Sequence, residues 1–233
     1  MFLASLRRRD RQAEIMDQPG LDPGEHRAAL RGLSRINSIS GSARILFPEL
    51  RRAAAKPLRV LDVATGGGDV PIRLWKQARL ARLPLHFSGC DVSPTALELA
   101  RESAARAGAE VEFFERDVLK DGLPEGFDII VCSLFLHHLT GSEAVELLRR
   151  MGQSARHMLL VNDLSRSKTG LLLAAIGSRV LSRSHVVHVD GPRSVRAAFT
   201  PTEALNLAYK AGLDGAKVVR RWPCRYLLSW RRE

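Results

Sequence analysis

The stretch that decides the fold of this chain is Arg59-Val60-Leu61-Asp62-Val63-Ala64-Thr65-Gly66-Gly67-Gly68-Asp69-Val70-Pro71. Its apolar first part predicts a short buried β-strand. The consecutive glycines predict a tight turn that a ligand can approach closely, because glycine has no Cβ. Pro71 suits the first turn of a helix, where its missing N–H would have no partner. A strand, a glycine turn and a helix in this order predict a nucleotide-like ligand in a doubly wound α/β fold.

The glycine spacing indicates which ligand this is. The dinucleotide pattern G-x-G-x-x-G would need a third glycine where Pro71 or Asp69 stands. No lysine follows the glycines, so the phosphate loop of nucleotide triphosphatases is absent as well. Asp62 would repel a phosphate and attract a cation. S-adenosylmethionine carries an ammonium and a sulfonium and no phosphate, so it fits this turn.

Residues 62–68 resemble the first motif of the class I S-adenosylmethionine-dependent methyltransferases, with Ala64 where the family has its first glycine. Three later features follow in the family's order: an expected second strand ends at Asp91, a third precedes Asp117, and a fourth leads to Ser133. The resemblance covers residues 58–163 well and the remainder weakly. It implies a Rossmann-like sheet, mostly parallel with an antiparallel last strand, and S-adenosylmethionine as the cofactor.

The resemblance also implies which residues bind the cofactor. Asp91 stands about 20 residues past the loop, where an acid meets ribose hydroxyls. Asp117 is expected to accept a hydrogen bond from the adenine amino group. The alternatives are that Asp91 caps the helix near Pro94, in competition with Ser93, and that Asp117 is a turn residue. The implied cofactor-binding set is Asp62, Ala64, Thr65, Gly66, Gly68, Asp91, Val92, Asp117, Val118 and Ser133.

Strand and helix patterns alternate over residues 58–163, which predicts a parallel sheet. We expect strands at 60–63, 85–91, 111–115, 127–132 and 158–161, helices at 25–33, 43–55, 94–107, 142–151 and 201–211, and a final hairpin from 216–221 and 225–229. The resulting fold class is a doubly wound α/β sheet with an N-terminal helical cap. We divide the chain into this extension, residues 1–57, and a methyltransferase domain, residues 58–233, with an acceptor-side insertion around 165–200.

Histidines are the candidate catalytic bases, because imidazole titrates near neutral pH. His185 and His188 lie in residues 184–193, which we expect to form an irregular insertion over the acceptor, with Asp190 orienting one imidazole. The alternative is a polar lid without chemistry. His137 is a third candidate, although the Leu-His-His-Leu segment of the resembling family often only packs or caps the next helix.

Four residues are predicted to contact the acceptor. Arg193 and Arg196 suit an acidic or phenolate group. Phe135 and His138 follow the fourth strand, and an apolar helix from Leu171 would line an apolar pocket together with Phe135 and Leu136. A largely apolar cleft with a few polar groups predicts a small organic acceptor.

No metal site is predicted, although two histidines and an aspartate of residues 185–190 would suit one in principle. The three cysteines form no C-x-x-C pattern, and a reducing cytoplasm fits them best. The net charge of +11 comes mostly from arginines spread along the chain, without interleaved aromatics, so nucleic-acid binding is disfavoured. No apolar stretch of about 18 residues occurs. The segment of residues 1–9 is too short for a signal peptide and is expected to be a disordered tail, with contact to an acidic membrane surface as an alternative. The oligomeric state stays open.

The expected function is methyl transfer from S-adenosylmethionine to a small, partly hydrophobic acceptor. Our first choice is O-methylation of a phenolic or polyketide-like compound in secondary metabolism. The alternatives are C-methylation of a quinone-type ring, methylation of RNA or protein, and cofactor binding without catalysis.

Overall fold

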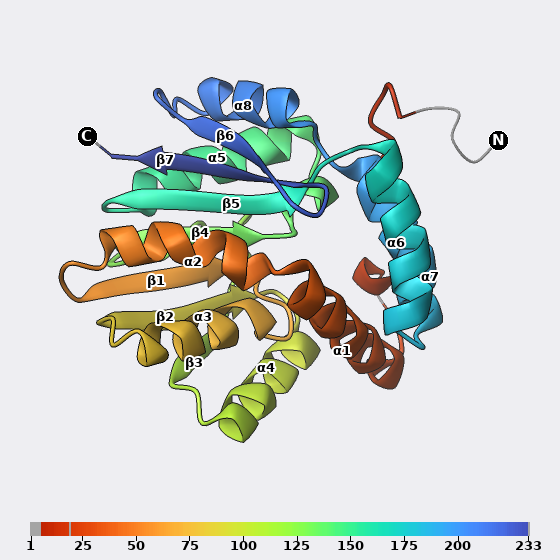
Figure 1. Cartoon of the computed structure of the whole chain (residues 1–233), viewed down its shortest axis with the longest axis horizontal. Helices are drawn as coiled ribbons and strands as arrows, with labels where there is room; N and C mark the ends of the chain where they lie inside the picture. The colour runs from red at the N-terminus through yellow and green to blue at the C-terminus, as the bar shows by residue number, and fades with distance from the viewer. Residues whose placement is uncertain (1–5, 19, 233) are drawn as a thin grey trace.

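The computed structural model describes residues 6–18 and 20–232, and in this part of the chain a seven-stranded sheet lies between two layers of helices (Figure 1). The strand order is β3-β2-β1-β4-β5-β7-β6, in which the first five strands are parallel and β7 runs antiparallel to both β5 and β6. The strands are β1 (Leu58–Val63), β2 (Leu85–Asp91), β3 (Val111–Glu115), β4 (Ile129–Ser133), β5 (Met158–Leu164), β6 (Lys217–Arg221) and β7 (Arg225–Arg231). The predicted fold class is confirmed, including the antiparallel last strand beside the fifth.

Alternating side chains of the central strands supply the two halves of the core. Val60 packs in a cluster with Leu46 of α2 and Leu74 of α3, whereas Leu61 packs with Leu147 of α5 on the opposite face. A parallel sheet buried on both faces explains the continuous apolar runs of its strands. The helices are α1 (Pro23–Ser40), α2 (Ser42–Ala53), α3 (Asp69–Leu80), α4 (Pro94–Ala107), α5 (Gly141–Ser154), α6 (Lys168–Leu181), α7 (His185–Ala197) and α8 (Pro201–Lys210), with 3-10 turns η1 (Ile15–Asp17) and η2 (Leu136–His138).

Short polar side chains set where several helices begin. Ser93 accepts a hydrogen bond from the Ala96 N–H and caps α4. Thr200 caps α8 in a capping box with Glu203, which satisfies two backbone N–H groups reciprocally. The helix predicted to begin after Thr200 is therefore confirmed.

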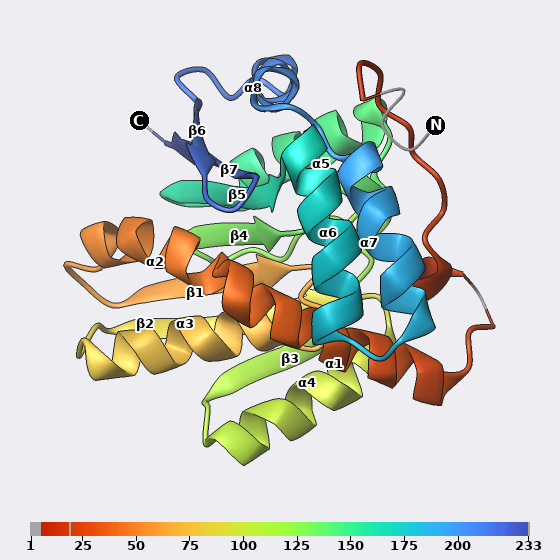
Figure 2. The same cartoon turned by 45° about the vertical axis from the view of Figure 1, so that its right-hand side comes forward.

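A group of helices covers the edge of the sheet where the parallel strands end (Figure 1). Figure 2, in which this side comes forward, shows α6 and α7 lying side by side and α1 crossing at their lower ends. Only part of the first 57 residues contributes to this cover, because α2 packs on a face of the sheet. The domain boundary at residue 57 stays a proposal.

Two local predictions are wrong. Residues 184–193 are not irregular: they belong to α7, whose Val186 and Val187 pack against Ala29 of α1. The two adjacent valines belong to the apolar face of this helix. In an extended chain His185 and His188 would have pointed to opposite faces, because they are three residues apart. The gap expected between the helices at 25–33 and 43–55 is also reduced to one residue, because α1 continues to Ser40 and ends at Gly41 in a left-handed conformation.

The expectation of a disordered N-terminal tail falls partly outside the described residues, which begin at Leu6. From there on it is wrong. The Arg9 guanidinium donates hydrogen bonds to the carbonyl oxygens of His137 and Leu139 at 2.7 and 2.6 Å, and it lies 3.8 Å from the ring centroid of Phe199. Among the helices of the described residues, none combines the length and the apolar character that crossing a bilayer requires.

Candidate active site

A cavity of about 1210 Å³ opens where the sheet order reverses between β1 and β4. Ligands of open α/β sheets bind at this switch point, beyond the carboxyl ends of the strands. One wall comes from the loops after β1, β2, β3 and β4, and the other from η1, α1, α6 and α7. Pockets for one small molecule have volumes of roughly 300–1,000 Å³, so this cavity has room for two ligands.

Strained backbone surrounds the cavity. Ala64, Leu134 and Cys224 line it and have positive φ angles of 54°, 59° and 49°. Such conformations cost about 1–3 kcal/mol for residues other than glycine, and they cluster at functional sites. Only glycine fits at position 68, because the Cβ of any other residue would lie 2.8 Å from Cζ of Phe113.

Asp62 presents an unsatisfied carboxylate oxygen to the cavity. The side chain is only 3% exposed. Its Oδ2 accepts a hydrogen bond of 2.7 Å from Thr65 Oγ1, whereas its Oδ1 has no hydrogen-bond partner among the described residues. Burial raises the pKa of Asp62 to about 8. A buried carboxylate oxygen without a donor is a site for a cationic group such as an ammonium.

Asp91 organises the glycine turn. Its Oδ2 accepts a hydrogen bond of 2.8 Å from the Gly66 N–H, and its Oδ1 accepts one of 2.9 Å from the Ser93 N–H. Burial raises the pKa of Asp91. The alternative in which Asp91 caps α4 is wrong, since Ser93 does so. Each carboxylate oxygen keeps a lone pair with which it could accept a hydroxyl hydrogen.

The remaining residues of the implied cofactor set also line the cavity, except for Gly68, which packs against Phe113 and Ala100 instead. Asp117 behaves as the turn alternative predicts: its Oδ1 accepts from the N–H groups of Leu119 and Lys120 at 3.0 and 3.1 Å. Ser133 Oγ accepts a hydrogen bond of 2.8 Å from Asn162 Nδ2. The roles of these residues toward the cofactor stay predictions.

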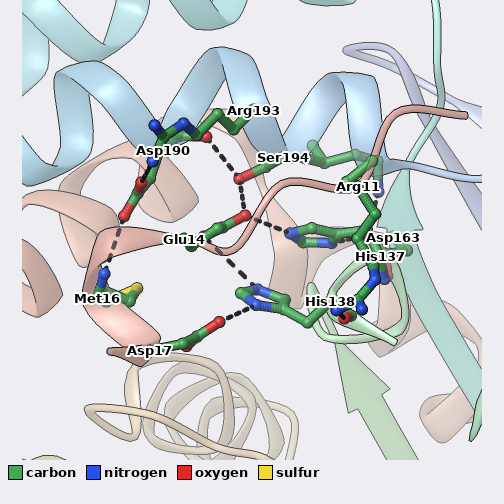
Figure 3. A network of polar contacts seen from close by, with 12 residues as sticks. Arg11, Glu14, Met16, Asp17, His137, His138, Asp163, Asp190, Arg193 and Ser194 are labelled. Atoms are coloured by element: carbon green, nitrogen blue, oxygen red, sulfur yellow. Dashed lines mark hydrogen bonds and ion pairs between the residues drawn. The ribbon is translucent and has the colours of Figure 1, made fainter. Parts of the chain in front are cut away.

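His137 and His138 enter the cavity from η2 (Figure 3). His137 is buried, and its Nδ1 lies 2.7 Å from Asp163 Oδ1. His138 Nδ1 lies 2.6 Å from Asp17 Oδ2. Burial would lower the pKa of His138, but the hydrogen bond to Asp17 and the charges of Glu14, Asp17 and Asp163 raise it to about 9. Phe135 stacks on His138 with 5.9 Å between ring centroids.

The expected group of His185, His188 and Asp190 does not form. Neither histidine lines the cavity. His188 Nε2 lies 2.7 Å from the Ser182 carbonyl oxygen, and His185 is exposed. The Asp190 carboxylate instead accepts hydrogen bonds from the N–H groups of Ile15 and Met16 and anchors η1 to α7.

The two predicted acceptor-binding arginines are also outside the cavity lining. Arg193 donates to the Ala13 carbonyl oxygen at 3.3 Å and lies 3.6 Å from Asp190. Arg196 is partly buried on α7, where its carbonyl oxygen accepts a hydrogen bond from the Asp10 N–H. Both prediction errors follow from taking a helix for an open loop.

Several cavity residues were missed by sequence reasoning. Asp69 Oδ2 is buried without a hydrogen-bond donor, although Arg73 Nη1 lies 3.5 Å away. Arg225 is buried, and Ser42 Oγ accepts a hydrogen bond of 2.6 Å from its Nη1, while its Nε has no partner among the described residues. Burial lowers the pKa of Arg225 to about 10. Glu14 and Asp17 were missed because no motif marks η1.

The chain is similar to known proteins over part of its length. A family model described as a methyltransferase domain matches residues 60–157. This match covers less than half of the chain, and it agrees with the resemblance of residues 62–68 to the first motif of the class I S-adenosylmethionine-dependent methyltransferases. The matched part of the chain holds most of β1, the glycine turn and β2 to β4, whereas β5, η1, α1, α6 and α7 lie outside it.

The chain spans about half the length of the curated relatives named here. A demethylmenaquinone methyltransferase of Thermus thermophilus is 34% identical over 107 residues, which cover 45% of this chain and 47% of that protein. A ubiquinone biosynthesis O-methyltransferase of Xylella fastidiosa is 29% identical over 141 residues, covering 57% of this chain and 52% of that protein.

Solved structures resemble this chain in fold. Magnesium protoporphyrin IX methyltransferase from Synechocystis, with bound S-adenosylhomocysteine, superposes with a TM-score of 0.61 at 16% identity and covers 86% of each chain. At this identity the likeness concerns the architecture, so the acceptor has to be argued from the cavity itself.

Proposed function

We propose that this protein binds S-adenosylmethionine at the edge of the sheet between β1 and β4 and transfers its methyl group to a small, partly hydrophobic acceptor. The carrying observation is the cavity, in which unsatisfied buried polar groups at the glycine turn face an apolar wall. The polar groups at the glycine turn suit a charged cofactor, and the apolar wall suits an apolar acceptor.

Complementary charges support the cofactor assignment. Asp62 and Asp69 offer carboxylate oxygens for the ammonium group, and Arg225 offers an unpaired N–H for the carboxylate. Arg35 of α1 is exposed and donates a hydrogen bond to the Leu181 carbonyl oxygen. Asp91 is suited to the ribose hydroxyls, as proposed from the sequence. When bound, the cofactor supplies a methyl group already activated on a sulfonium, so the protein has mainly to align the acceptor and exclude water.

The acceptor wall is apolar and partly open to solvent. It includes Leu33 and Ile39 of α1, Ile176 and Val180 of α6, and Trp222 between β6 and β7. Ile176, Val180 and Trp222 are 53%, 73% and 76% exposed. A group of exposed hydrophobic side chains around a cavity marks a binding surface for apolar ligands. This wall supports an aromatic or otherwise greasy acceptor.

O-methylation of a phenolic or polyketide-like compound remains our first choice of reaction. The name of the Xylella relative includes O-methylation, and His137 with its Asp163 partner lies in the cavity where a hydroxyl proton has to leave. C-methylation of a quinone-type ring is the second candidate, favoured by the name of the Thermus relative. We also propose that the reaction belongs to secondary metabolism. A reducing cytoplasm is the proposed location, since all three cysteines are unpaired.

Two measurements test the proposal. Isothermal titration calorimetry with S-adenosylhomocysteine is expected to give one saturable site per chain. Incubation with isotopically labelled methyl donor and a panel of phenols, polyketides and quinones, followed by mass spectrometry, is expected to show a labelled product with an apolar acceptor. Absence of a saturable site would refute the cofactor assignment. Binding without turnover on any acceptor would instead favour a non-catalytic role.

A further inference from the structure

Glu14, His137 and His138 form a compact group at the cavity, and their potential ligand atoms all lie within 4.8 Å of one another (Figure 3). His137 Nε2 lies 3.7 Å from Glu14 Oε1, and His138 Nε2 lies 3.8 Å from Glu14 Oε2. These distances are too long for direct hydrogen bonds. They are close to the separation of about 3.4 Å expected between two ligands that each lie about 2.1 Å from one tetrahedral zinc ion.

The surroundings of the two imidazoles are those of metal ligands. The Nδ1 atom of His137 is held by Asp163, and the Nδ1 atom of His138 is held by Asp17. A metal ion binds the neutral imidazole, in which a carboxylate that accepts from Nδ1–H leaves the lone pair of Nε2 free, and this arrangement is the usual support of metal-binding histidines. Glu14 is oriented as well, by a hydrogen bond of 2.5 Å from Ser194 Oγ. Three side chains, Asp163, Asp17 and Ser194, thus orient the three potential ligands toward one point.

The electrostatics also call for a positive charge there. Glu14 and Asp163 are both buried carboxylates, and burial of anionic groups is unfavourable unless they are paired. Arg9 and Arg11 lie near this region, but their guanidinium groups donate hydrogen bonds to the carbonyl oxygens of residues 137, 138 and 139. A divalent cation between Glu14 and the two Nε2 atoms would compensate the buried charge.

We propose that Glu14, His137 and His138 bind a divalent transition-metal ion such as zinc, with an open coordination position toward the acceptor cavity. Two histidines and one glutamate with a vacant fourth position are the ligand set of several catalytic zinc sites. The role of the ion rests on the proposed function: an acceptor hydroxyl that occupies the open position releases its proton to solvent water, and its oxygen stays on the ion as the anion. The ion would therefore favour an oxygen acceptor.

This proposed site differs from the sequence-based expectation of no metal. Sequence patterns could not have predicted these three ligands together. Glu14 lies far from the histidines along the chain, so no ligand spacing is visible. The contact exists because Asp190 holds η1 against α7, which places Glu14 over η2.

Metal binding is measurable without any acceptor. The protein is stripped with a chelator and titrated with Zn²⁺ by calorimetry and with Co²⁺ by visible absorption. We expect one ion per chain and the absorption of four- or five-coordinate cobalt. The isosteric variant Glu14→Gln is expected to bind at least about 100-fold more weakly, and Asp17→Asn about 10-fold more weakly. The control His185→Gln, an exposed histidine outside the cavity, is expected to bind as the wild type does.

S-adenosylhomocysteine binding by the same samples separates this proposal from the proposed function. Intact binding of that compound by Glu14→Gln shows that the variant is folded. If the wild type takes up no stoichiometric metal, or if Glu14→Gln binds it equally well, the metal site is refuted while the cofactor assignment stands. If the wild type binds metal but no S-adenosylhomocysteine, the metal site stands and the proposed function fails.

Discussion

The two walls of the cavity differ in how they are built. The cofactor wall consists of polar groups from consecutive strand ends between β1 and β4, joined by hydrogen bonds such as that from the Gly66 N–H to Asp91. The acceptor wall consists mainly of apolar side chains from η1, α1, α6 and α7, which come from opposite ends of the chain. The family match includes the first wall and omits most of the second. The difference explains why sequence motifs predict the cofactor but not the acceptor.

Each wall also presents an unfavourable surface of its own kind. The cofactor wall buries carboxylates whose pKa values are raised by burial, Asp62 and Asp91 among them. The acceptor wall exposes large hydrophobic side chains. A charged ligand would relieve the first, and an apolar ligand would relieve the second. Variants on the two walls should therefore have separable effects.

The largest effect is expected from Asp91→Ala on the cofactor wall. The substitution removes the acceptor of the Gly66 and Ser93 N–H groups as well as the proposed ribose contact. Hydrogen bonds to a charged group contribute about 1.5–3 kcal/mol each, so S-adenosylhomocysteine should bind at least about 100-fold more weakly. Calorimetry measures this, with the exposed Glu112→Ala as a control. Unchanged affinity in Asp91→Ala would remove the assigned site.

On the acceptor wall, Ile176→Asp should raise the KM for the acceptor and leave cofactor affinity unchanged. Losing the burial of one aliphatic side chain costs about 1.5–3 kcal/mol, which corresponds to about 10- to 100-fold in KM. The control is Leu80→Asp, which makes the same type of change at a side chain 87% exposed and outside the cavity lining. An equal loss of cofactor affinity in Ile176→Asp would mean that the two walls are not separable.

A smaller effect is expected from pH. The pKa of Asp62 is raised to about 8, so at pH 6 this carboxyl group is mostly protonated in the free protein. A bound ammonium favours the ionised form, and binding therefore releases a proton. Affinity should then rise with pH up to about 8, by at most about tenfold per pH unit for one proton.

Calorimetry in buffers of different ionisation enthalpy counts the protons released on binding of S-adenosylhomocysteine. Asp62→Asn should release fewer protons than the wild type does, because only the other buried carboxyl groups remain. An identical count in both proteins would show that Asp62 does not face the cation.

The smallest effect is expected from His188→Ala. Since His188 lies outside the cavity lining and bonds to the Ser182 carbonyl oxygen, turnover should change by less than about twofold, while loss of the hydrogen bond lowers the free energy of unfolding by about 1 kcal/mol. Initial rates and thermal unfolding measure the two. A large loss of turnover without loss of stability would restore His188 as a catalytic candidate.

The amino-acid sequence by itself determined the strands of the sheet, their mostly parallel arrangement and the main residues at the glycine turn. Asp62, the glycines and Asp91 lie at the ends of adjacent strands, and parallel strands bring such ends together whatever else the chain does. Local patterns were sufficient here because each feature depends on residues close along the chain. The start of α8 after Thr200 could be predicted for the same reason.

Only the tertiary structure decided the acceptor wall. Residues 184–193 contain glycine, proline and mixed polarity, and their helical state depends on packing of Val186 and Val187 against α1. That packing moved His185 and His188 away from the cavity, while the bonds of Asp190 to η1 brought Glu14 to the histidines of η2. Contacts between segments that are distant along the chain leave no periodicity or spacing to interpret, because they depend on how finished elements pack.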